Sequence, residues 1–428
     1  MNGTKTWKPF ILVLAGVIGL SLYTYLLVNP VSAAEKYDLV FWHAKASHRG
    51  KVWQKMVGEF NKTHPNIQVK ATYQGGYTAT LQKITTAIAA GATPDASEIP
   101  NRYGTPQFAE SGKLLALNQF MSKKEVDDIF EGVRKRFTYK GKLYAIPNAT
   151  SNSLLYYNAD AFKEVGLDPD KPPKTWDELV ACAKKLTRDL NGDGKIDKWG
   201  LGTHTTTNYF LYGLILQNGG QVLDDNGNPL FNSKEGVEAC QFWSDLVHKH
   251  KVMPPLTHDA TNKLFVSGTT AMMFQSTSFL EKLDKQVGKR FEVRVDFLPK
   301  KKRYGTGLGG TGIGIFKSNP KREAATWEFV KWVTNPKWAA YWSENTGYIV
   351  TTKSALKLPS HKEFLKTNSM FNVAARQMKY AALLPSTKAD GIIYGPFSKL
   401  AEKMEADPNV DIKKELDAIA EVVRKEAK

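Results

Sequence analysis

Aromatic and small polar side chains follow several predicted strands of this 428-residue chain. Trp42 lies near the end of the first predicted strand, Tyr77 follows the second, and Asn101 follows the third. Aromatic rings offer apolar faces to the C–H groups of a sugar or polyol, while hydroxyl and amide groups fix its orientation. The carboxyl ends of strands in an open α/β sheet meet at one edge, so these residues predict a reversible sugar or polyol site.

Three later residues have the same character. Ser151 precedes the apolar segment LLYY, Ser276 follows the strand-like AMMFQ, and Tyr348 ends the segment TGY. Taken singly, a tyrosine is more often a packing residue than a ligand contact. Their shared position at strand ends and loops favours a binding role for the set.

A second pattern resembles the start of a calcium-binding loop. Oxygen-bearing side chains alternate at Asp189, Asn191 and Asp193, and Asp197 follows them. Position twelve, where such a loop places a bidentate glutamate, is Gly200. The pattern therefore predicts at most a weak structural calcium site, and a solvated turn is the alternative.

Motifs of catalysis and of cofactor binding are missing from the sequence. It contains no H-E-x-x-H, G-x-S-x-G or phosphate-loop motif. A G-x-G-x-x-G pattern at 307–312 is followed by a predicted strand, whereas a dinucleotide fingerprint opens a helix. We therefore expect a binding protein without a cofactor. An exported polysaccharide-active hydrolase is the alternative, because its two carboxylates need not be neighbours in the sequence.

The first 34 residues have the three parts of a secretory signal peptide. Lys5 and Lys8 precede an apolar run at 10–28, Pro30 breaks the helix, and small residues at 31–34 offer a cleavage site. The run is long enough to span a bilayer, so an uncleaved membrane anchor is the alternative. No cysteine lies near the cleavage site, which excludes a lipoprotein. We expect a periplasmic or extracellular protein.

Composition agrees with a folded, exported chain. It is 42% hydrophobic and 11% aromatic, which excludes extensive disorder, and its net charge is +17. The basic excess is spread along the sequence, with no nucleic-acid-binding motif, and predicts a solvated basic surface. The two cysteines, Cys182 and Cys240, lie in separate predicted helices and are expected to be free thiols.

The order of predicted elements indicates two α/β lobes, each with a doubly wound, mainly parallel sheet. Residues 35–146 form the first part of the first lobe, and residues 147–308 form the first part of the second. The chain returns to the first lobe at 309–350, and helices at 351–428 complete the second. Two lobes joined by several crossings form a hinged clamp, in which a ligand binds between the lobes.

One segment carries a family resemblance. Residues 156–179, YYNADAFKEVGLDPDKPPKTWDEL, resemble the signature of extracellular solute-binding proteins, family 1, of sugar-type ABC importers. Within it, Thr175 and Glu178 form a T-x-x-E capping box that predicts where a helix begins. The resemblance implies a type II periplasmic-binding-protein-like clamp. It also implies a monomeric, non-enzymatic protein that delivers its ligand to the membrane subunits of an ABC permease.

Within the family, the resemblance is closest to the glycerol-3-phosphate-binding members. It extends over most of the chain, including ATYQGGYTATLQ, LGGTG and NPKWAAYWSENTGY. It implies ligand contacts from Tyr77, Ser151, Ser276, Gly310 and Tyr348. Asn101 stands where those members have a glutamate, and Lys399 lies near the position of their arginine. These departures leave sugars, oligosaccharides, glycerol-3-phosphate and glycerophosphodiesters as possible ligands.

Overall fold

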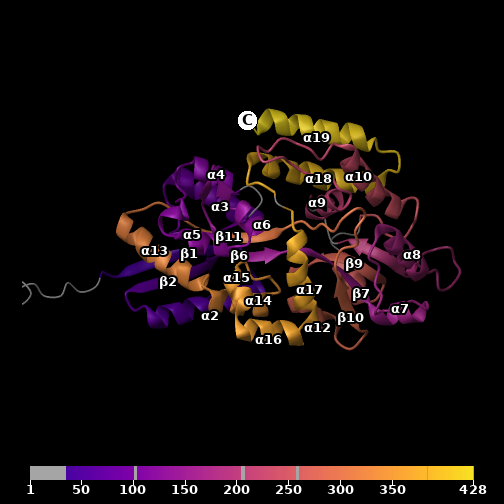
Figure 1. The fold of residues 1–428 in the computed structure, drawn as a ribbon, viewed down its shortest axis with the longest axis horizontal. Helices are drawn as coiled ribbons and strands as arrows, with labels where there is room; N and C mark the ends of the chain where they lie inside the picture. Colours follow the sequence, from indigo (N-terminus) through magenta and orange to yellow (C-terminus); the bar gives the residue numbers. More distant parts are fainter. Residues whose placement is uncertain (1–34, 101–103, 204–207, 257–259, 383, 428) are drawn as a thin grey trace, which may run out of the picture.

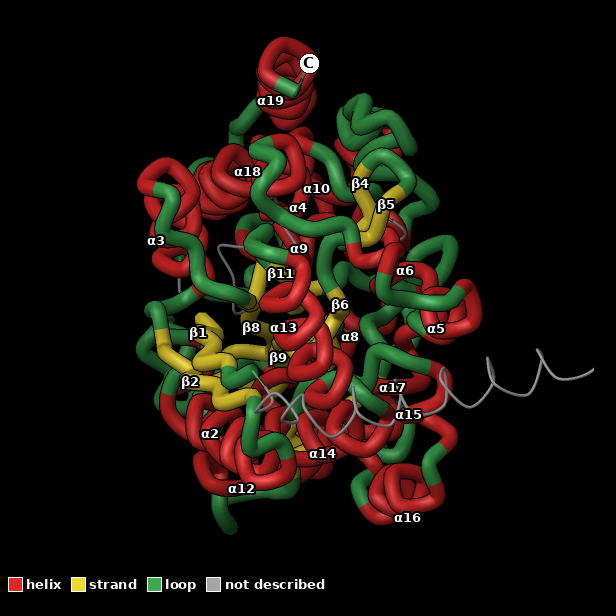
Figure 2. The backbone as a smooth tube through the Cα atoms, turned by 90° about the vertical axis from the view of Figure 1, so that its left-hand side faces the viewer, coloured by secondary structure: helices red, strands yellow, loops and turns green. Residues whose placement is uncertain are grey.

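The computed structural model describes residues 35–100, 104–203, 208–256, 260–382 and 384–427. In these residues, strands form a five-stranded and a four-stranded sheet, with helices around both (Figure 1). A view from the side shows the strands in the centre of the molecule and the helices outside (Figure 2). This arrangement confirms the predicted two-lobe α/β fold. The expected signal peptide at 1–34 lies outside the described residues.

The five-stranded sheet belongs to the first lobe and has the order β2-β1-β3-β11-β6. Its strands are β1 (Tyr37–His43), β2 (Ile67–Tyr73), β3 (Ala96–Pro100), β6 (Ile146–Ser151) and β11 (Gly309–Ile315). Leu39 and Phe41 alternate with more exposed residues along β1 and reach the core formed with Trp53 and Phe60. This period of two is what a strand with one covered face requires.

Helices and short elements complete the first lobe. They are α2 (Ser47–Thr63), α3 (Tyr77–Ala90), α4 (Gly104–Glu110), η1 (Leu117–Gln119), α5 (Lys123–Asp128), α6 (Glu131–Lys135), β4 (Thr138–Tyr139), β5 (Lys142–Leu143), α13 (Pro320–Val333) and α14 (Pro336–Thr346). Asn319 and Asn335 cap the last two helices, and each is followed by a proline at the first helical position. That proline costs no hydrogen bond, because its N–H would have no partner in the helix.

The four-stranded sheet belongs to the second lobe and has the order β10-β7-β9-β8. Its strands are β7 (Ser153–Asn158), β8 (Trp199–Thr203), β9 (Thr270–Ser276) and β10 (Val293–Asp296). The helices around it are α7 (Ala159–Glu164), α8 (Trp176–Leu186), α9 (Asn208–Gln217), α10 (Lys234–Val247), α11 (Thr261–Val266), η2 (Thr277–Phe279), α12 (Leu280–Val287), α18 (Lys388–Ala406) and α19 (Ile412–Glu426). Trp176, Trp243 and Phe397 are buried in the core that these elements share.

The capping box at the start of α8 differs in one bond from the expected pattern. Thr175 accepts from the backbone N–H of Glu178 at 3.2 Å, as expected. The Glu178 carboxylate accepts from the backbone N–H of Lys174 at 2.7 Å, one residue before the cap. The predicted helix start is confirmed, with the reciprocal bond shifted by one residue.

Between the lobes lie α15 (Lys353–Lys357), α16 (Pro359–Thr367), α17 (Ser369–Gln377) and η3 (Met378–Tyr380). They follow Ile349, whose backbone N–H donates to the carbonyl oxygen of Thr150 in β6 at 2.7 Å. The chain therefore returns along the edge of the first sheet before it enters α18 of the second lobe.

Both sheets are mixed, which corrects the expectation of mainly parallel sheets. β1 is parallel to β2 and β3, but β11 is antiparallel to β3 and β6. In the second sheet, β8 and β9 are parallel, and β7 is antiparallel to β9 and β10. The reason is the crossings: β11 enters the first sheet from the second lobe and therefore runs against β3. Because β6 lies in the first sheet, the chain leaves that sheet at Asn152, later than the expected boundary at residue 146.

A buried ion pair joins the lobes. Arg136 lies beside first-lobe core residues, and Asp390 lies on α18; their side chains are 2.7 Å apart and almost inaccessible to water. The hydroxyl of Tyr212 donates to the same carboxylate at 3.0 Å. Two ions buried in this way have lost their hydration, so each depends on the other for stabilisation.

We expect Asp390→Asn to lower the free energy of unfolding by about 3–5 kcal/mol, because it removes the negative charge that lies 2.7 Å from the buried Arg136 guanidinium. Glu421→Gln is the matched control, since Glu421 forms an exposed pair with Arg424 and such pairs contribute at most about 1 kcal/mol. Urea unfolding of both variants measures the difference. Equal midpoints would contradict the role given to the buried pair.

Candidate ligand-binding site

Lys45, just after β1, lies at the centre of a group of polar and aromatic residues. Its side chain is buried, and Nζ donates to the hydroxyl of Tyr77 at 2.9 Å and to that of Thr311 at 3.2 Å. The same ammonium lies 4.5 Å from the ring centre of Tyr77 and 4.9 Å from that of Tyr348. Contacts of this kind between a cation and aromatic rings are favourable when the cation is shielded from water.

Glu98 of β3 supplies the negative charge beside Lys45. Its side chain is fully buried, and Oε1 lies 3.8 Å from Lys45 Nζ. The carboxylate also accepts from the backbone N–H of Ala44 at 2.9 Å and from Asn148 Nδ2 at 2.8 Å. The Thr311 hydroxyl lies 3.1 Å from Oε1. One carboxylate thus connects the end of β1 with β3, β6 and β11.

This arrangement keeps Lys45 charged. Burial alone lowers the pKa of the ammonium, but the charge of Glu98 and the phenols of Tyr348 and Tyr77 raise it above its ordinary value. The ammonium of Lys45 therefore stays charged at neutral pH beside the carboxylate of Glu98.

The two predicted tyrosines meet. Tyr77 is the first residue of α3, Tyr348 follows α14, and their hydroxyl oxygens are 3.0 Å apart. Gly347, with φ of 76°, ends α14 in the left-handed region and turns the chain so that Tyr348 reaches the site. Burial raises the pKa of Tyr77. Burial also acts to raise the pKa of Tyr348, but the charges of Lys45 and Arg49 bring it below its ordinary value.

Arg49 of α2 links this group to the second lobe. Its guanidinium lies 5.1 Å from the ring centre of Tyr348 and donates to the carbonyl oxygens of Thr346 and Ser278. It also lies 3.6 Å from the carboxylate of Glu281 in α12. Both cations described here are therefore paired with carboxylates.

Hydroxyl groups of the second lobe and of the crossing to it gather around Tyr209 of α9. Burial raises the pKa of Tyr209, and interactions with the hydroxyls of Ser153, Ser276 and Ser151 partly offset that effect. The charge of Tyr348 also acts on it, so the two groups of residues are close together. The Tyr209 hydroxyl is buried, and no residue in the described part of the chain is aligned to hydrogen-bond with it. A buried hydroxyl of this kind is suited to bind a polar ligand.

The predicted Gly310 acts through its backbone. It lies in β11 opposite Thr150, with φ of 134°, and a Cβ atom there would lie 1.7 Å from the carbonyl oxygen of Ala149. Only glycine allows β11 and β6 to approach this closely. The next residue, Thr311, is thereby placed beside Lys45.

Two predicted residues lie elsewhere, and one cannot be placed. Trp42 and His43 are neighbours in β1, so their side chains lie on opposite faces of the sheet. The Trp42 side chain packs against the cluster that includes Ile84 of α3, away from Lys45. Lys399 is exposed on α18 and lines a shallow groove with Leu256 and Lys403. Asn101 lies outside the described residues. The structure thus brings together Tyr77, Ser151, Ser276, Gly310 and Tyr348.

Calcium binding stays a prediction. The carboxylate of Asp189 accepts from the backbone N–H groups of Gly192 and Gly194, each at 2.8 Å, and Asp197 accepts from that of Leu190 at 2.7 Å. Within the residues that the structure describes, no three or more histidine, cysteine or carboxylate side chains are grouped to hold a metal.

The cysteines are free, as predicted. Cys240 is buried, Cys182 is half-buried, and neither forms a disulfide. Burial raises the pKa of the Cys240 thiol to about 12.

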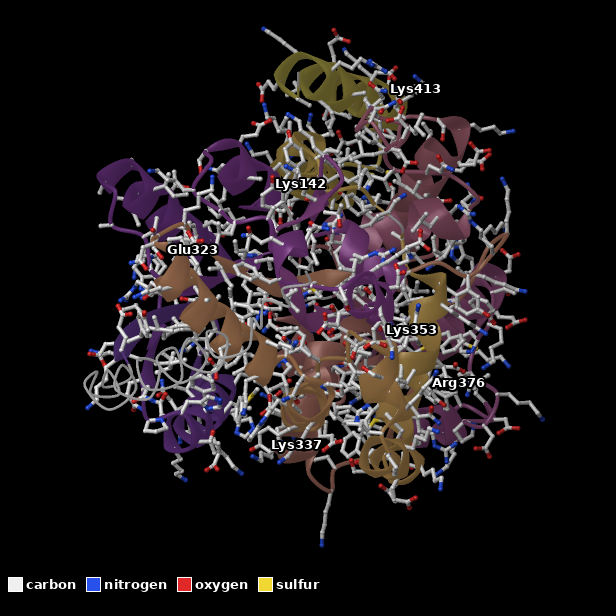
Figure 3. All side chains as sticks on the ribbon, turned by 60° about the vertical axis from the view of Figure 1, so that its left-hand side comes forward. Lys142, Glu323, Lys337, Lys353, Arg376 and Lys413 are labelled. Atoms are coloured by element: carbon white, nitrogen blue, oxygen red, sulfur yellow. The ribbon has the colours of Figure 1, made fainter. Side chains whose placement is uncertain are left out.

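The basic surface is dispersed. Lys142, Lys337, Lys353, Arg376 and Lys413 are exposed and come from different parts of the chain (Figure 3). None of the described helices combines the length and the apolar character that crossing a membrane requires.

A cavity of about 990 Å³ lies near the edge strand β6, where the lining residue Ile349 pairs with Thr150. Residues of both lobes line it, among them Val133, Leu223, Tyr304, Val350 and Tyr380. It contains none of the sequence-predicted site residues.

Known proteins were compared with the chain. Residues 55–371 match the model of a family described as bacterial extracellular solute-binding proteins. The chain belongs to this family. The sn-glycerol-3-phosphate-binding periplasmic protein UgpB of Yersinia pestis is 26% identical to this solute-binding protein over 375 residues, covering 85% of each.

Solved structures agree with the fold. The crystal structure of UgpB from Mycobacterium tuberculosis with glycerophosphocholine has a TM-score of 0.78 and 25% identity, covering 91% of this chain and 98% of that one. The cyclic α-maltosyl-1,6-maltose-binding protein of Arthrobacter globiformis also has a TM-score of 0.78, at 24% identity, with the same coverage. The predicted family and the type II clamp are confirmed, and the comparisons give no support to a polysaccharide-active enzyme.

Sequence reasoning missed four residues of the candidate site of this solute-binding protein: Lys45, Glu98, Thr311 and Tyr209. One signal was available for Glu98, which is an acidic residue inside the buried-strand pattern DASEI. A carboxylate in such a strand needs a partner, and a search for a nearby cation could have led to Lys45.

We expect Gly310→Ala to lower the free energy of unfolding by at least about 2 kcal/mol, since the methyl group collides with backbone and the residue has an unfavourable φ. Gly395→Ala, in α18, is the control: its Cβ would meet no atom within 4 Å. Thermal and urea unfolding measure both. If Gly310→Ala were as stable as the wild type, the close approach of β11 and β6 would be wrong.

Proposed function

We propose that this protein is the exported receptor of an ABC importer, which binds a carbohydrate or a glycerol-phosphate-type polyol between its lobes and delivers it to the permease. The observation that carries this proposal is the meeting of two hydroxyl-rich groups. Tyr77 and Tyr348 come from the first lobe, and Tyr209 and Ser276 come from the second. A ligand with several hydroxyl groups would bridge them and stabilise the closed arrangement of the lobes.

Charge in the site favours recognition of hydroxyl groups. Lys45 is paired with Glu98, and Arg49 is paired with Glu281, so these four charges sum to zero. A neutral sugar needs no further counter-charge here. A glycerol phosphate would need a cation from outside these pairs.

Relatives support the glycerol-phosphate class. The Yersinia pestis protein is named for sn-glycerol-3-phosphate, and one solved structure contains glycerophosphocholine. The proposal has three further parts. Segment 1–34 exports the protein into the periplasm or the extracellular space. The protein acts as a monomer and does not catalyse a reaction. A membrane anchor formed by an uncleaved N-terminus is the alternative for the export segment.

A ligand panel tests the proposal. We expect the tryptophan fluorescence of the purified chain without residues 1–34 to respond to one class among monosaccharides, oligosaccharides, glycerol-3-phosphate and glycerophosphocholine. Small-angle scattering should show compaction with the same ligand. The absence of both responses across the panel would contradict a solute receptor. Release of small products from a polysaccharide would instead support an enzyme.

A further inference from the structure

The hydrogen bond between Lys45 and Tyr77 can have only one donor. An ammonium group only donates, because nitrogen carries no free lone pair. The hydroxyl oxygen of Tyr77, 2.9 Å from Lys45 Nζ, must therefore accept from it. One acceptor position of this phenol is then used by a residue of the protein itself.

The two phenols have one hydroxyl proton too many for the contacts between them. Tyr77 and Tyr348 share one hydrogen bond of 3.0 Å, in which either oxygen can be the donor. If Tyr77 donates, the proton of Tyr348 is left over; if Tyr348 donates, the proton of Tyr77 is left over. No further acceptor for either hydroxyl occurs in the described part of the chain. In both cases the pair presents one O–H donor.

Glu98 holds Lys45 in this position. It accepts from the N–H of Ala44, the residue before Lys45, and its Oε1 lies 3.8 Å from the ammonium. A buried ammonium without such a counter-ion would lose its charge or move towards water. Lys45 also donates to Thr311, so its contacts are with protein groups and its effect on a ligand passes through the phenols.

We propose that Lys45, held by Glu98, is a positioning residue that makes the Tyr77–Tyr348 pair a hydrogen-bond donor, so that the ligand presents an acceptor oxygen to this pair. This inference rests on the function proposed above and narrows it. Hydroxyl, ether and phosphate oxygens can accept such a bond. A protonated amino group cannot, and the charge of Lys45 repels it as well.

The charges around Tyr348 strengthen the donor. Burial and the charge of Glu98 act to raise the pKa of Tyr348, but the charges of Lys45 and Arg49 and the hydrogen bond with Tyr77 bring it below its ordinary value. A more acidic phenol forms the stronger hydrogen bond to an acceptor, as in other polarised chains of hydrogen bonds.

The first test needs no ligand. Tyrosinate absorbance is titrated in the wild type and in Tyr348→Phe, and the difference reports what the Tyr348 phenol adds to the titration of the Tyr77–Tyr348 pair. We expect the same difference, measured in the Lys45→Met background, to move to higher pH. Lys45→Met/Glu98→Gln removes both charges and is the variant to use if the single one fails to fold. Lys413→Met, at an exposed site on α19, should change nothing.

The second test uses the ligand that responds in the panel. We expect Lys45→Met to weaken its binding about tenfold, as the loss of one well-directed polar contact does. Lys45→Arg should restore part of the affinity, and Lys413→Met should leave it intact. An analogue with a protonated amino group should bind more weakly to the wild type, and Lys45→Met should reduce that discrimination.

The outcomes separate this inference from the proposed function. An unchanged Tyr348 titration in the Lys45→Met background would overturn the positioning role. A shifted titration with full ligand affinity would also overturn it, while the receptor function would stand. A shifted titration without any responding ligand would support the positioning of the phenols and count against the proposed function.

Discussion

A fully buried carboxylate, Glu98, determines how the first lobe can be built around its site. It binds the backbone at Ala44, the amide of Asn148 and the ammonium of Lys45, and thereby ties together β1, β3 and β6. A buried charge is costly unless every partner is present, so these contacts are mutually dependent. The phenols of Tyr77 and Tyr348 are placed around the cation that Glu98 neutralises. The chemistry of the site thus follows from one ion pair.

The strands that carry this ion pair also connect the lobes. β6 leads through Asn152 directly into β7, and β11 enters the first sheet from the second lobe. Gly310 allows these two strands to approach closely beside Thr311. The second buried pair, Arg136 with Asp390, joins α18 to the first lobe some distance along the chain from the site. A change in the angle between the lobes would therefore move residues of the site, because β6 and β11 form part of the site and also connect the lobes.

Much of the fold could be predicted from local pattern, and much of the site could not. The strand that ends near Trp42 and the helix start capped by Thr175 depend on neighbours in the sequence, and both are observed. Tyr77, Ser151 and Tyr348 were found through a resemblance that extends over most of the chain. Trp42 packs on the other face of β1, because alternation along a strand does not say which face meets the site, and its ligand contact stays a prediction. The Lys45–Glu98 pair and the antiparallel entry of β11 depend on contacts between distant segments, and local pattern does not contain them. Lys399 was assigned where the resemblance is weak, and its ligand contact stays a prediction.

The most direct measurement is a crystal structure of the complex with the ligand that responds in the panel. The account predicts a ligand oxygen within hydrogen-bond distance of the Tyr77 or Tyr348 hydroxyl, and a second contact from Ser151, Tyr209 or Ser276. Lys45 should remain beside Glu98 and contact the phenols. A ligand bound in the cavity near β6, or one that presents only donor groups to the two phenols, would contradict the account.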